Sequence, residues 1–491
     1  MLKSIKDMLQ ALEDNEIKYC HWKSNEHLLE ALTGDTDLDV LFLPEQRSKI
    51  DKVLNECGLK RFRAMPLMQY NAIEDFIGFD KEEAKIWHLH VHYRMTLGEK
   101  HLKGYTITSW TRYIIDNREW DELGIYRASS EIELVLLIVR LALKRRLRDT
   151  NRKISKDDLI EYNWLVNRVD KEKLYIVAEK MTNNIIATLI IELCSGNLKR
   201  RGQLAKLQRR LRKNFKYYTG YNQMGSRLMR TWREFFWLIG GVQRRIGISS
   251  TKANRRVSPS GGCVVAILGC DGAGKSTTLK YVKNEFRKKI DVLTIYFGSG
   301  DGSSSLLRKP MKVIAKKIGG KGIGHSIDKE YAEKDTKRVS LKARLYSFAK
   351  IVWAVTLACE KKKKLKKMTK ARNAGLLVLT DRYPQTEYAG FSDGPLLQRY
   401  ATGTGIFKKI SDWEYRIYRS AYINPPDLTI KLMVPAEIAI SRKPEMTIEE
   451  IENKKRAVMA MKISEYSTVV DTSKNMKETF GEVMDAIWKI I

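Results

Sequence analysis

A run of glycines followed by lysine and serine is the part of this 491-residue sequence whose residue types point most directly to a chemistry. Residues 269–276 read GCDGAGKS and fit the pattern GxxxxGK[ST] at every fixed position. Glycines let a backbone wrap around a phosphate with its amide groups pointing inward, and a following helix adds positive field at its N-terminus. The pattern predicts a phosphate-binding loop that includes Gly269, Gly272, Ala273 and Gly274.

The residues that follow these glycines have predicted roles in nucleotide binding. Lys275 would reach the β- and γ-phosphates, Ser276 would ligate Mg²⁺, and Thr277 would continue the nucleotide contact. Asp381 ends the apolar stretch 376–380, which is typical of a buried strand. Because the carboxyl ends of parallel strands face the ligand crevice, we favour a metal or phosphate role for Asp381 over helix capping.

A second candidate site lies near the N-terminus. Asp37 and Asp39 are alternate residues on either side of Leu38 in a predicted strand, so both carboxylates lie on one face and could share divalent metal ions. On the predicted strand 86–92, His88, His90 and His92 alternate in the same way, so that three imidazoles could meet one metal or one phosphate. The alternative for the histidines is a hydrogen-bonded polar face of the sheet.

The elements that must position these residues are strands alternating with helices. Short apolar stretches at 264–268, 291–297, 376–380, 428–434 and 468–471 are separated by helical segments, which is typical of a parallel α/β sheet. Helical patterns also cover 131–148, 157–169, 171–181 and 185–193, and the stretch 249–262 has the composition of a linker. The sequence predicts a multidomain α/β fold with a basic helical part between two α/β parts.

The C-terminal half resembles thymidylate kinases and related nucleoside-monophosphate kinases. The resemblance covers about residues 262–491 and is carried by residues 269–277, by LVLTDRY at 377–383, and by residues 426–437 with Arg442. It implies a P-loop kinase that uses ATP and Mg²⁺ for phosphoryl transfer. It also implies that Asp271 contacts an acceptor sugar, that Arg382 holds an acceptor phosphate, and that Arg442 is a lid arginine.

Two segments depart from the family pattern. GSGDGSSS at 298–305 stands where the family carries an Arg-Glu-Pro-Gly-type segment, and the element after the DRY motif, 384–395, is altered. Residues 298–372 also form a long basic insertion. We therefore expect that the residues for phosphoryl transfer are retained and that the acceptor pocket differs from that of the family. The expected acceptor is a nucleotide or a sugar-containing phosphate of surface-polysaccharide metabolism.

The N-terminal quarter resembles the nucleotidyltransferase superfamily, through CHWKSN at 20–25 and DTDLDVL at 35–41. The resemblance implies metal ions held by the two carboxylates of the D-x-D pair. His90 stands where family members tend to carry a further acid. We place a nucleotidyltransferase-like domain at 1–130, a basic α-helical domain with its linker at 131–256, and the kinase-like domain at 257–491.

Charge is distributed unevenly along the chain. The net charge is +32, yet residues 1–130 are net −4, whereas residues 198–256 hold 17 basic groups and one acid. This block predicts an anionic partner, either a membrane surface or a nucleic acid. For the aromatic residues of 227–239, RLMRTWREFFWLI, our first expectation is a buried core and our second is a membrane surface. We expect the lysine run, Lys361–Lys364 with Lys366, Lys367 and Lys370, to be a solvated helix face that could add to the same basic surface.

Composition limits the remaining classes. The six cysteines are scattered, no apolar stretch approaches about 18 residues, and the first residues lack the apolar core of a signal peptide. We expect a cytoplasmic protein, and any association with a membrane would be peripheral and at its inner face. The sequence allows either a monomer or a homodimer. The expected function is an ATP- and Mg²⁺-dependent phosphotransferase. Alternatives are a nucleotidyltransferase acting through Asp37 and Asp39 with a nucleotide-sensing P-loop domain, or a nucleic-acid-binding defence effector.

Overall fold

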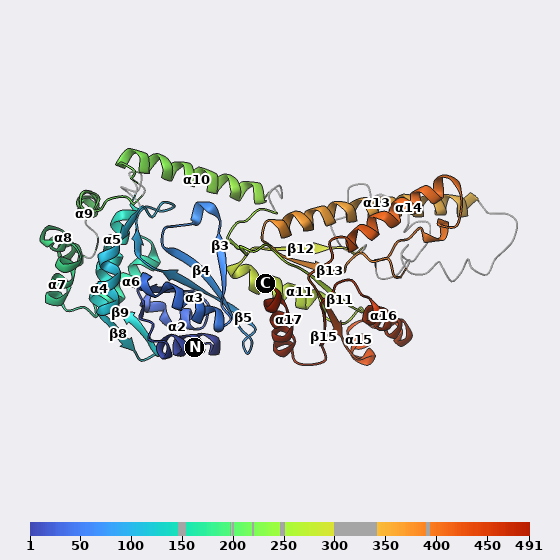
Figure 1. Ribbon diagram of the computed structural model, residues 1–491, viewed down its shortest axis with the longest axis horizontal. Coiled ribbons are helices and arrows are strands. Elements are labelled where there is room, and N and C mark those ends of the chain that lie inside the picture. Colours follow the sequence, from blue (N-terminus) through green and yellow to red (C-terminus); the bar gives the residue numbers. More distant parts are fainter. Residues whose placement is uncertain are drawn as a thin grey trace. The chain divides into compact units, whose positions relative to one another are not determined.

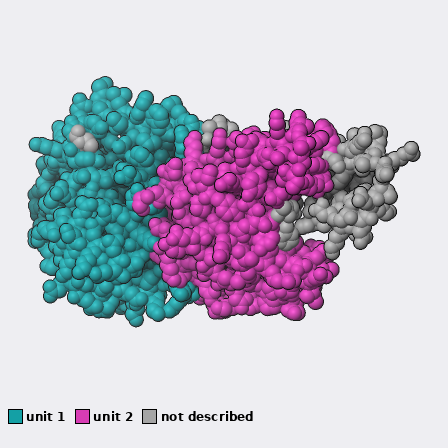
Figure 2. All heavy atoms as spheres, turned by 45° about the vertical axis from the view of Figure 1, so that its right-hand side comes forward, with its two compact units in different colours: residues 1–259 teal, residues 260–491 magenta. Residues whose placement is uncertain are grey.

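The chain divides into two compact units, Met1–Pro259 and Ser260–Ile491, which Figure 2 colours separately. The computed structural model describes residues 1–145, 154–196, 198, 201–218, 220–245, 251–298, 341–388 and 393–491. Most of the predicted basic insertion, 299–340, lies outside these residues, as do parts of the basic block 198–256 and of the altered element 384–395. Both units combine sheets with helices, and the multidomain α/β class expected from the sequence is confirmed.

The N-terminal unit is built on a mixed sheet (Figure 1). Over the described residues its strand order is β10-β3-β4-β5-β2-β1-β9-β8, with β6 and β7 paired separately. The pair β2–β5 is parallel, whereas β4–β5 and β1–β2 are antiparallel. The strands are β1 (Tyr19–His21), β2 (Asp37–Phe42), β3 (Lys60–Ala64), β4 (Ile73–Asp80), β5 (Lys85–His92), β6 (Met95–Leu97), β7 (Tyr105–Ile107), β8 (Arg118–Asp121), β9 (Ile125–Ala128) and β10 (Arg256–Val257).

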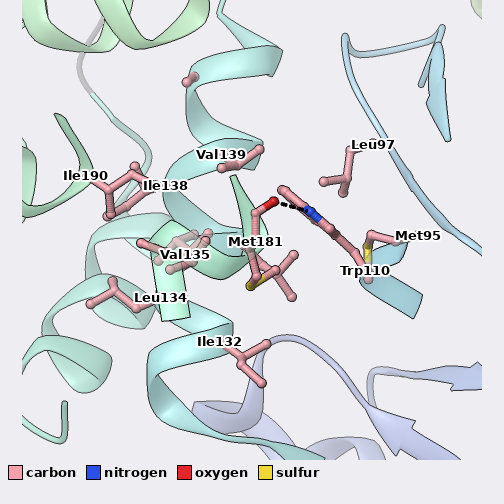
Figure 3. Packing of buried hydrophobic residues seen from close by; sticks show 14 of the residues in the cluster. Met95, Leu97, Trp110, Ile132, Leu134, Val135, Ile138, Val139, Met181 and Ile190 are labelled. Atoms are coloured by element: carbon pink, nitrogen blue, oxygen red, sulfur yellow. Dashed lines mark hydrogen bonds between the residues drawn. The ribbon is translucent and has the colours of Figure 1, made fainter. Parts of the chain in front are cut away.

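The helices of this unit pack against the sheet and around one central helix, α5. They are α1 (Lys3–Asp14), α2 (Leu28–Leu32), α3 (Arg47–Glu56), α4 (Thr108–Asp116), α5 (Ser130–Lys144), α6 (Lys156–Val166), α7 (Lys171–Met181), α8 (Asn184–Ser195), α9 (Arg201–Asn214) and α10 (Gln223–Arg245). α5 is apolar almost all round, as expected for a helix enclosed by others. Figure 3 shows its side chains packed with those of neighbouring helices, where the Trp110 indole donates to the backbone carbonyl of Met181.

The stretch expected to be a linker contributes a strand. Arg256 and Val257 pair antiparallel with Ala64 and Arg63 of β3, and the backbone amide of Met65 donates to the carbonyl of Arg255. Serine, proline and glycine mark local turns, but they carry no information on whether the few residues between them find a sheet edge. The linker interpretation therefore does not hold for 255–257, which belong to the N-terminal unit's sheet.

The C-terminal unit has a parallel sheet whose strands run in the order β12-β13-β11-β14-β15 over the described residues. The strands are β11 (Val264–Gly269), β12 (Val292–Tyr296), β13 (Leu377–Asp381), β14 (Leu428–Met433) and β15 (Ser467–Asp471). The helices are α11 (Lys275–Lys289), α13 (Leu341–Asn373), α14 (Gly405–Arg419), α15 (Ala436–Arg442), α16 (Ile448–Ala460) and α17 (Met476–Ile490). The first strand, β11, is central, so the loop that follows it opens between neighbouring strand ends.

One expectation about side-chain exposure was wrong, and a second failed at a single residue. The aromatic residues of α10 are not core, because Trp232 and Phe235 expose more than half of their surface. In the lysine run of α13, expected to be a solvated helix face, Lys361 is buried with its ammonium 4.6 Å from the centre of the Tyr418 ring and 3.0 Å from the carbonyl oxygen of Asp393. Among the described residues, no helix is both long and apolar enough to cross a membrane.

Candidate functional site

The predicted phosphate-binding loop connects β11 to α11. Gly274 precedes the helix at φ 79°, and Gly272 has φ 84°, a left-handed conformation that glycine adopts without strain. A Cβ atom on Gly272 would lie 2.6 Å from the carbonyl oxygen of Ala439, so space as well as backbone angle requires glycine there. Gly269 is confined in the same way, because its Cβ would lie 2.8 Å from the carbonyl oxygen of Leu432. These constraints fix the loop directly before the N-terminus of α11.

Lys275 is the first residue of α11, and its side chain turns back over the loop. Its ammonium donates to the carbonyl oxygens of Gly269 and Cys270, at 3.0 and 2.7 Å. Burial lowers the pKa of Lys275, and the charges of Asp271 and Asp381 oppose that shift. Ser276 and Thr277 follow on the exposed start of the helix. The ammonium is thus held in the loop, among carboxylates.

Asp381 ends β13, the strand beside β11. The register pairs Ile267 with Asp381, which places this carboxylate at the carboxyl edge of the sheet where the loop begins. Asp381 is buried, and among the described residues its Oδ1 atom has no hydrogen-bond partner. Burial raises the pKa of Asp381, while Lys275 and Arg382 act in the opposite direction. A buried carboxylate oxygen without a partner is costly unless something binds it, and it is the kind of ligand that Mg²⁺ prefers.

The loop acid Asp271 is held by two cations. Lys454, on α16, donates to Asp271 Oδ2 at 2.5 Å, and the Arg382 guanidinium lies 3.6 Å from Oδ1. Burial would raise the pKa of Asp271, but the hydrogen bond and charge of Lys454 outweigh it and lower the pKa to about 2. Asp271 is therefore ionised throughout the physiological pH range.

The two arginines expected at the site are both placed near the loop. Arg382 has φ 66°, and its guanidinium lies 3.5 Å from a carboxylate oxygen of Asp393. Arg442, the last residue of α15, donates to the carbonyl oxygens of Gly272 and Thr472, at 3.1 and 3.2 Å. The hydroxyl of Thr472 donates in turn to the carbonyl of Ala273, at 3.2 Å. Arg442 thus links α15 to the loop in this structure.

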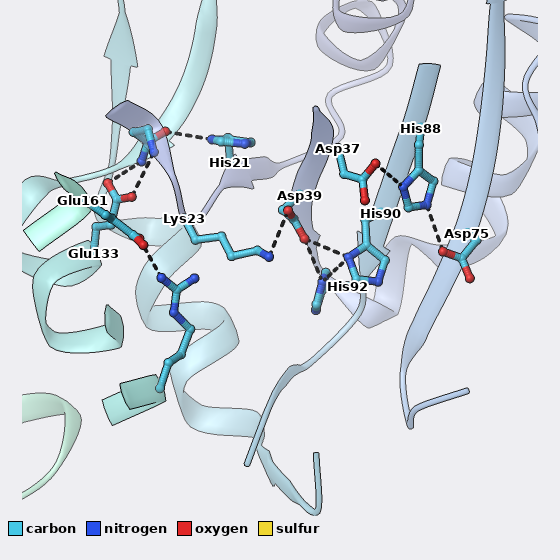
Figure 4. Close-up of polar contacts among 12 residues, drawn as sticks. His21, Lys23, Asp37, Asp39, Asp75, His88, His90, His92, Glu133 and Glu161 are labelled. Carbon is cyan, nitrogen blue, oxygen red and sulfur yellow. Dashed lines mark hydrogen bonds and ion pairs between the residues drawn. The ribbon is translucent and has the colours of Figure 1, made fainter. Parts of the chain in front are cut away.

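In the N-terminal unit, Asp39 lies at the centre of a second cluster, shown in Figure 4. Its Oδ1 atom accepts a hydrogen bond from Nδ1 of His90 at 2.7 Å and lies 3.5 Å from Nε2 of His92. Its Oδ2 atom lies 3.0 Å from the Lys23 ammonium. Burial would raise the pKa of Asp39, but Lys23 and the two imidazoles hold it well below the usual range. Burial lowers the pKa of both histidines.

Asp37 points to a different partner. His88 lies between carboxylates, with Nδ1 3.0 Å from Asp37 and Nε2 2.8 Å from Asp75 (Figure 4). Asp75 also accepts a hydrogen bond from Arg256 at 2.8 Å. The register explains the separation, because β2 and β5 pair Asp37 with His88 and Asp39 with His90. Of the residues predicted as metal or phosphate ligands in this unit, the structure gathers Asp39, His90 and His92, whereas Asp37 and His88 stand outside that group.

Several lysines surround the cluster. Burial lowers the pKa of Lys103 to about 7, with repulsion from Lys23 adding to the shift and Asp39 opposing it. Burial likewise lowers the pKa of Lys144, at the end of α5, to about 8. The site therefore combines one carboxylate, two imidazoles and cationic side chains, a set suited to a metal or to a phosphate-containing ligand.

Sequence reasoning missed four residues of these sites: Asp75, Lys103, Lys454 and Thr472. Asp75 shares one face of β4 with Ile73 and Ile77, and an acid on an apolar strand face was a usable signal once the neighbouring strand had been identified. Lys454 belongs to the sequence KKR at 454–456, and nothing in that run distinguishes the lysine that reaches the loop. Lys103 and Thr472 lie outside any pattern that could have been recognised.

Comparison with known proteins gives two relatives from Escherichia coli K12. The chain is 30% identical over 192 residues to the uncharacterized ATP-binding protein YghS, which covers 39% of this chain and 77% of that protein. This chain belongs to the family of YghS. It is also 29% identical over 195 residues to the uncharacterized ATP-binding protein YghR, covering 39% of this chain and 73% of YghR. No family model matches the chain. The YghS match leaves more than half of the chain without a counterpart in that relative.

Proposed function

We propose that the C-terminal unit binds ATP with Mg²⁺ and transfers its γ-phosphoryl group to an acceptor that carries a phosphate or a hydroxyl. The observation that carries the proposal is the buried Oδ1 atom of Asp381, which has no hydrogen-bond partner among the described residues. Asp381 ends the strand next to β11, and the glycine-containing loop after β11 leads directly into the N-terminus of α11. The relatives YghS and YghR are both named as ATP-binding proteins, which supports nucleotide binding.

The residues fit roles in positioning and electrostatic stabilisation. The amides of the loop and the N-terminus of α11 would hold the phosphates, and Lys275 would exchange its contacts with the Gly269 and Cys270 carbonyls for the β- and γ-phosphate oxygens. Ser276 and Asp381 would hold Mg²⁺, which neutralises charge on the phosphates when bound. Arg442 would stabilise charge on the transferring group from the side of α15.

The acceptor would bind beside Asp271 and Arg382. Arg382 is about one-third exposed and close to the loop acid, so it can offer its guanidinium to an acceptor phosphate. Asp271 is ionised and can accept a hydrogen bond from an acceptor hydroxyl. We propose a nucleotide or a sugar-containing phosphate as acceptor, because the segments that differ from the thymidylate kinase pattern are those expected to line its pocket.

The decisive experiment follows transfer of labelled γ-phosphate from ATP by the full chain to nucleoside monophosphates, phosphosugars and lipid-linked sugars. Lys275→Ala should reduce transfer by at least about 100-fold, as expected when a cation that stabilises transition-state charge is lost. Lys280→Ala is the matched control, since Lys280 is an exposed lysine on the same helix. Equal turnover in Lys275→Ala and wild type would refute the proposal.

One further pair of variants separates this function from nucleotidyl transfer by the N-terminal unit. If Asp37 and Asp39 carried the activity, Asp37→Ala would abolish it and Lys275→Ala would only modulate it. Under our proposal the order of the two effects is reversed. Measuring α- and γ-labelled ATP in parallel identifies which group is transferred.

A further inference from the structure

We infer that Asp39, His90 and His92 form a binding site for one divalent transition-metal ion in the N-terminal unit. The three ligand atoms Asp39 Oδ1, His90 Nδ1 and His92 Nε2 are separated by 2.7, 3.3 and 3.5 Å. A tetrahedral centre with bonds of about 2.0–2.2 Å separates its ligands by about 3.3–3.6 Å. The triangle already has nearly this size, so metal binding needs movements well below the length of one bond.

The backbone fixes this triangle. Parallel pairing of β2 with β5 puts Asp39 opposite His90, and alternation along β5 brings His92 to the same face. The ring centroids of His90 and His92 lie 4.5 Å apart in an edge-to-face arrangement, and those of His92 and Trp22 lie 5.1 Å apart in the same kind of arrangement. All three ligands come from strands inside the sheet, which holds their positions before any ion arrives.

The donor set selects the class of metal. Two imidazole nitrogens and one carboxylate suit Zn²⁺, Fe²⁺, Co²⁺ and similar ions, whereas Mg²⁺ prefers oxygen ligands and retains its water. A neutral imidazole offers the lone pair of one ring nitrogen to such an ion, and His92 is buried inside the sheet. The site therefore differs in metal class from the Mg²⁺ site proposed for the phosphate-binding loop.

The surrounding cations indicate what completes the coordination. Lys23 already occupies Oδ2 of Asp39, which leaves Oδ1 for the metal. A divalent ion here adds to the positive charge of Lys23, so its remaining positions favour an anion such as a phosphate oxygen over neutral water. The site is thus a metal centre that binds one anionic group.

The test uses the full chain, stripped of metal with a chelator and kept without ATP. Calorimetric titration should show one Zn²⁺ bound per chain, without competition from millimolar Mg²⁺, and inorganic phosphate should increase the Zn²⁺ affinity. His90→Gln and His92→Gln should each weaken Zn²⁺ binding at least about tenfold, a loss already typical of outer-shell partners. His27→Gln is the control, because His27 is exposed and outside the cluster.

Two results would overturn the inference: no stoichiometric Zn²⁺ binding by the wild type, or binding that survives both substitutions unchanged. Circular dichroism reports whether the variants fold. If they do not, Co²⁺ substitution in the wild type decides, because a site with nitrogen and oxygen ligands and low coordination number gives visible absorption bands that octahedral aqueous Co²⁺ lacks. Absence of these bands would also reject the site.

We further propose that α10 docks on the surface of an anionic lipid bilayer. The helix exposes apolar residues at intervals of three, four and seven, which places them on one face: Met224, Leu228, Trp232, Phe235, Leu238 and Val242. The opposite face holds the helix to its own unit through Ser226, which is fully buried, and through Arg233, whose guanidinium donates to the carbonyl of His101 at 3.1 Å. α10 therefore turns its apolar face outward and Arg233 inward.

The composition of the exposed face favours lipid over nucleic acid. Nucleic-acid platforms stack bases on aromatic rings, whereas Met224 and Leu228, with 74% and 69% of their surface exposed, have no ring to stack. Aliphatic residues mixed with Trp and Phe suit the boundary between headgroups and acyl chains. The preceding helix, α9, exposes the cations Lys206, Arg209, Arg210 and Lys213, and these complement anionic headgroups.

Flotation of the full chain with vesicles tests this surface. The wild type should float with vesicles that contain phosphatidylglycerol and remain unbound with pure phosphatidylcholine. Leu228→Gln/Phe235→Gln should reduce the bound fraction at least tenfold, while Ile406→Gln, which changes an exposed isoleucine elsewhere, should leave it unchanged. Equal binding by all variants would refute the proposal. The proposal would also be refuted if the wild type did not bind vesicles and the double variant instead lost self-association or DNA binding.

Discussion

Lys454 and Asp271 are 183 residues apart in the sequence, yet the Lys454 ammonium donates a 2.5 Å hydrogen bond to the carboxylate of Asp271. This contact ties α16 to the phosphate-binding loop and keeps Asp271 ionised. It also compensates a negative charge that would otherwise repel the phosphates of a nucleotide. The cation on α16 is therefore part of the electrostatic balance of the loop.

Removing Lys454 should weaken ATP binding. In Lys454→Met, the charge of Asp271 is compensated by Lys275 and by Arg382 at 3.6 Å, without the hydrogen bond from Lys454. A charge-assisted hydrogen bond of this kind contributes about 1.5–3 kcal/mol. We expect the Kd for ATP, measured by calorimetry, to rise about tenfold or more. The double variant Asp271→Asn/Lys454→Met should recover part of the loss, because the uncompensated charge is gone. If the losses caused by Asp271→Asn and by Lys454→Met simply added up in the double variant, direct coupling between the two residues would be rejected.

Gly272 should tolerate no side chain. In Gly272→Ala, the new Cβ would lie 2.6 Å from the Ala439 carbonyl oxygen at a positive φ, so we expect about 2–4 kcal/mol of destabilisation and loss of ATP binding. Gly405→Ala is the matched control, because Gly405 has a similar φ of 78° with nothing within 4 Å of its Cβ. Urea unfolding compares the two. Equal destabilisation would mean that backbone strain alone, and not the close approach to α15, requires glycine at 272.

The strands of the parallel sheet and the glycine-containing turn between β11 and α11 could be predicted because their signals are local. A short apolar stretch followed by glycines, lysine and serine specifies its own strand, turn and helix, and β11 begins at the expected Val264. The pairing of Asp39 with His90 could not be predicted, since it depends on the register between β2 and β5, about 50 residues apart. Alternation along a strand predicts which of its side chains share a face, but it does not predict which other strand pairs with that strand.

The failed expectations for α10 and for Lys361 have different causes. Periodicity in 227–239 shows that an apolar face exists, but the sequence does not say whether that face turns toward the unit or away from it. In α10 buried Ser226 and the Arg233 contact turn it outward. For Lys361 a signal was present: Lys361, Leu365 and Met368 recur at spacings of four and three, and all three are buried. A lysine on an apolar face is a candidate for burial with a specific partner.

Lys361 should contribute strongly to stability for this reason. Lys361→Met removes the cation that faces buried Asp393, leaving Arg382 at 3.5 Å to compensate that carboxylate, and breaking a buried pair from one side costs about 3–5 kcal/mol. Lys363→Met, on the exposed side of the same helix, should change the free energy of unfolding by less than about 0.5 kcal/mol. Urea unfolding of the full chain measures both. Similar small effects would show that Lys361 is better solvated than its position indicates.

Lys103 should make the stability of the N-terminal unit depend on pH. The folded chain releases the Lys103 proton near pH 7, because burial lowers its pKa to about 7, whereas the unfolded chain holds this proton to about pH 10.4. Between these values the unfolded state binds more protons, so stability should rise with pH, by at most about 1.4 kcal/mol per unit from this residue. In Lys103→Met this contribution disappears, whereas Lys100→Met, at an exposed neighbour, should keep it. The measurement is urea unfolding at pH 6, 7.5 and 9, and parallel pH profiles for wild type and Lys103→Met would show that Lys103 keeps its proton in the folded chain.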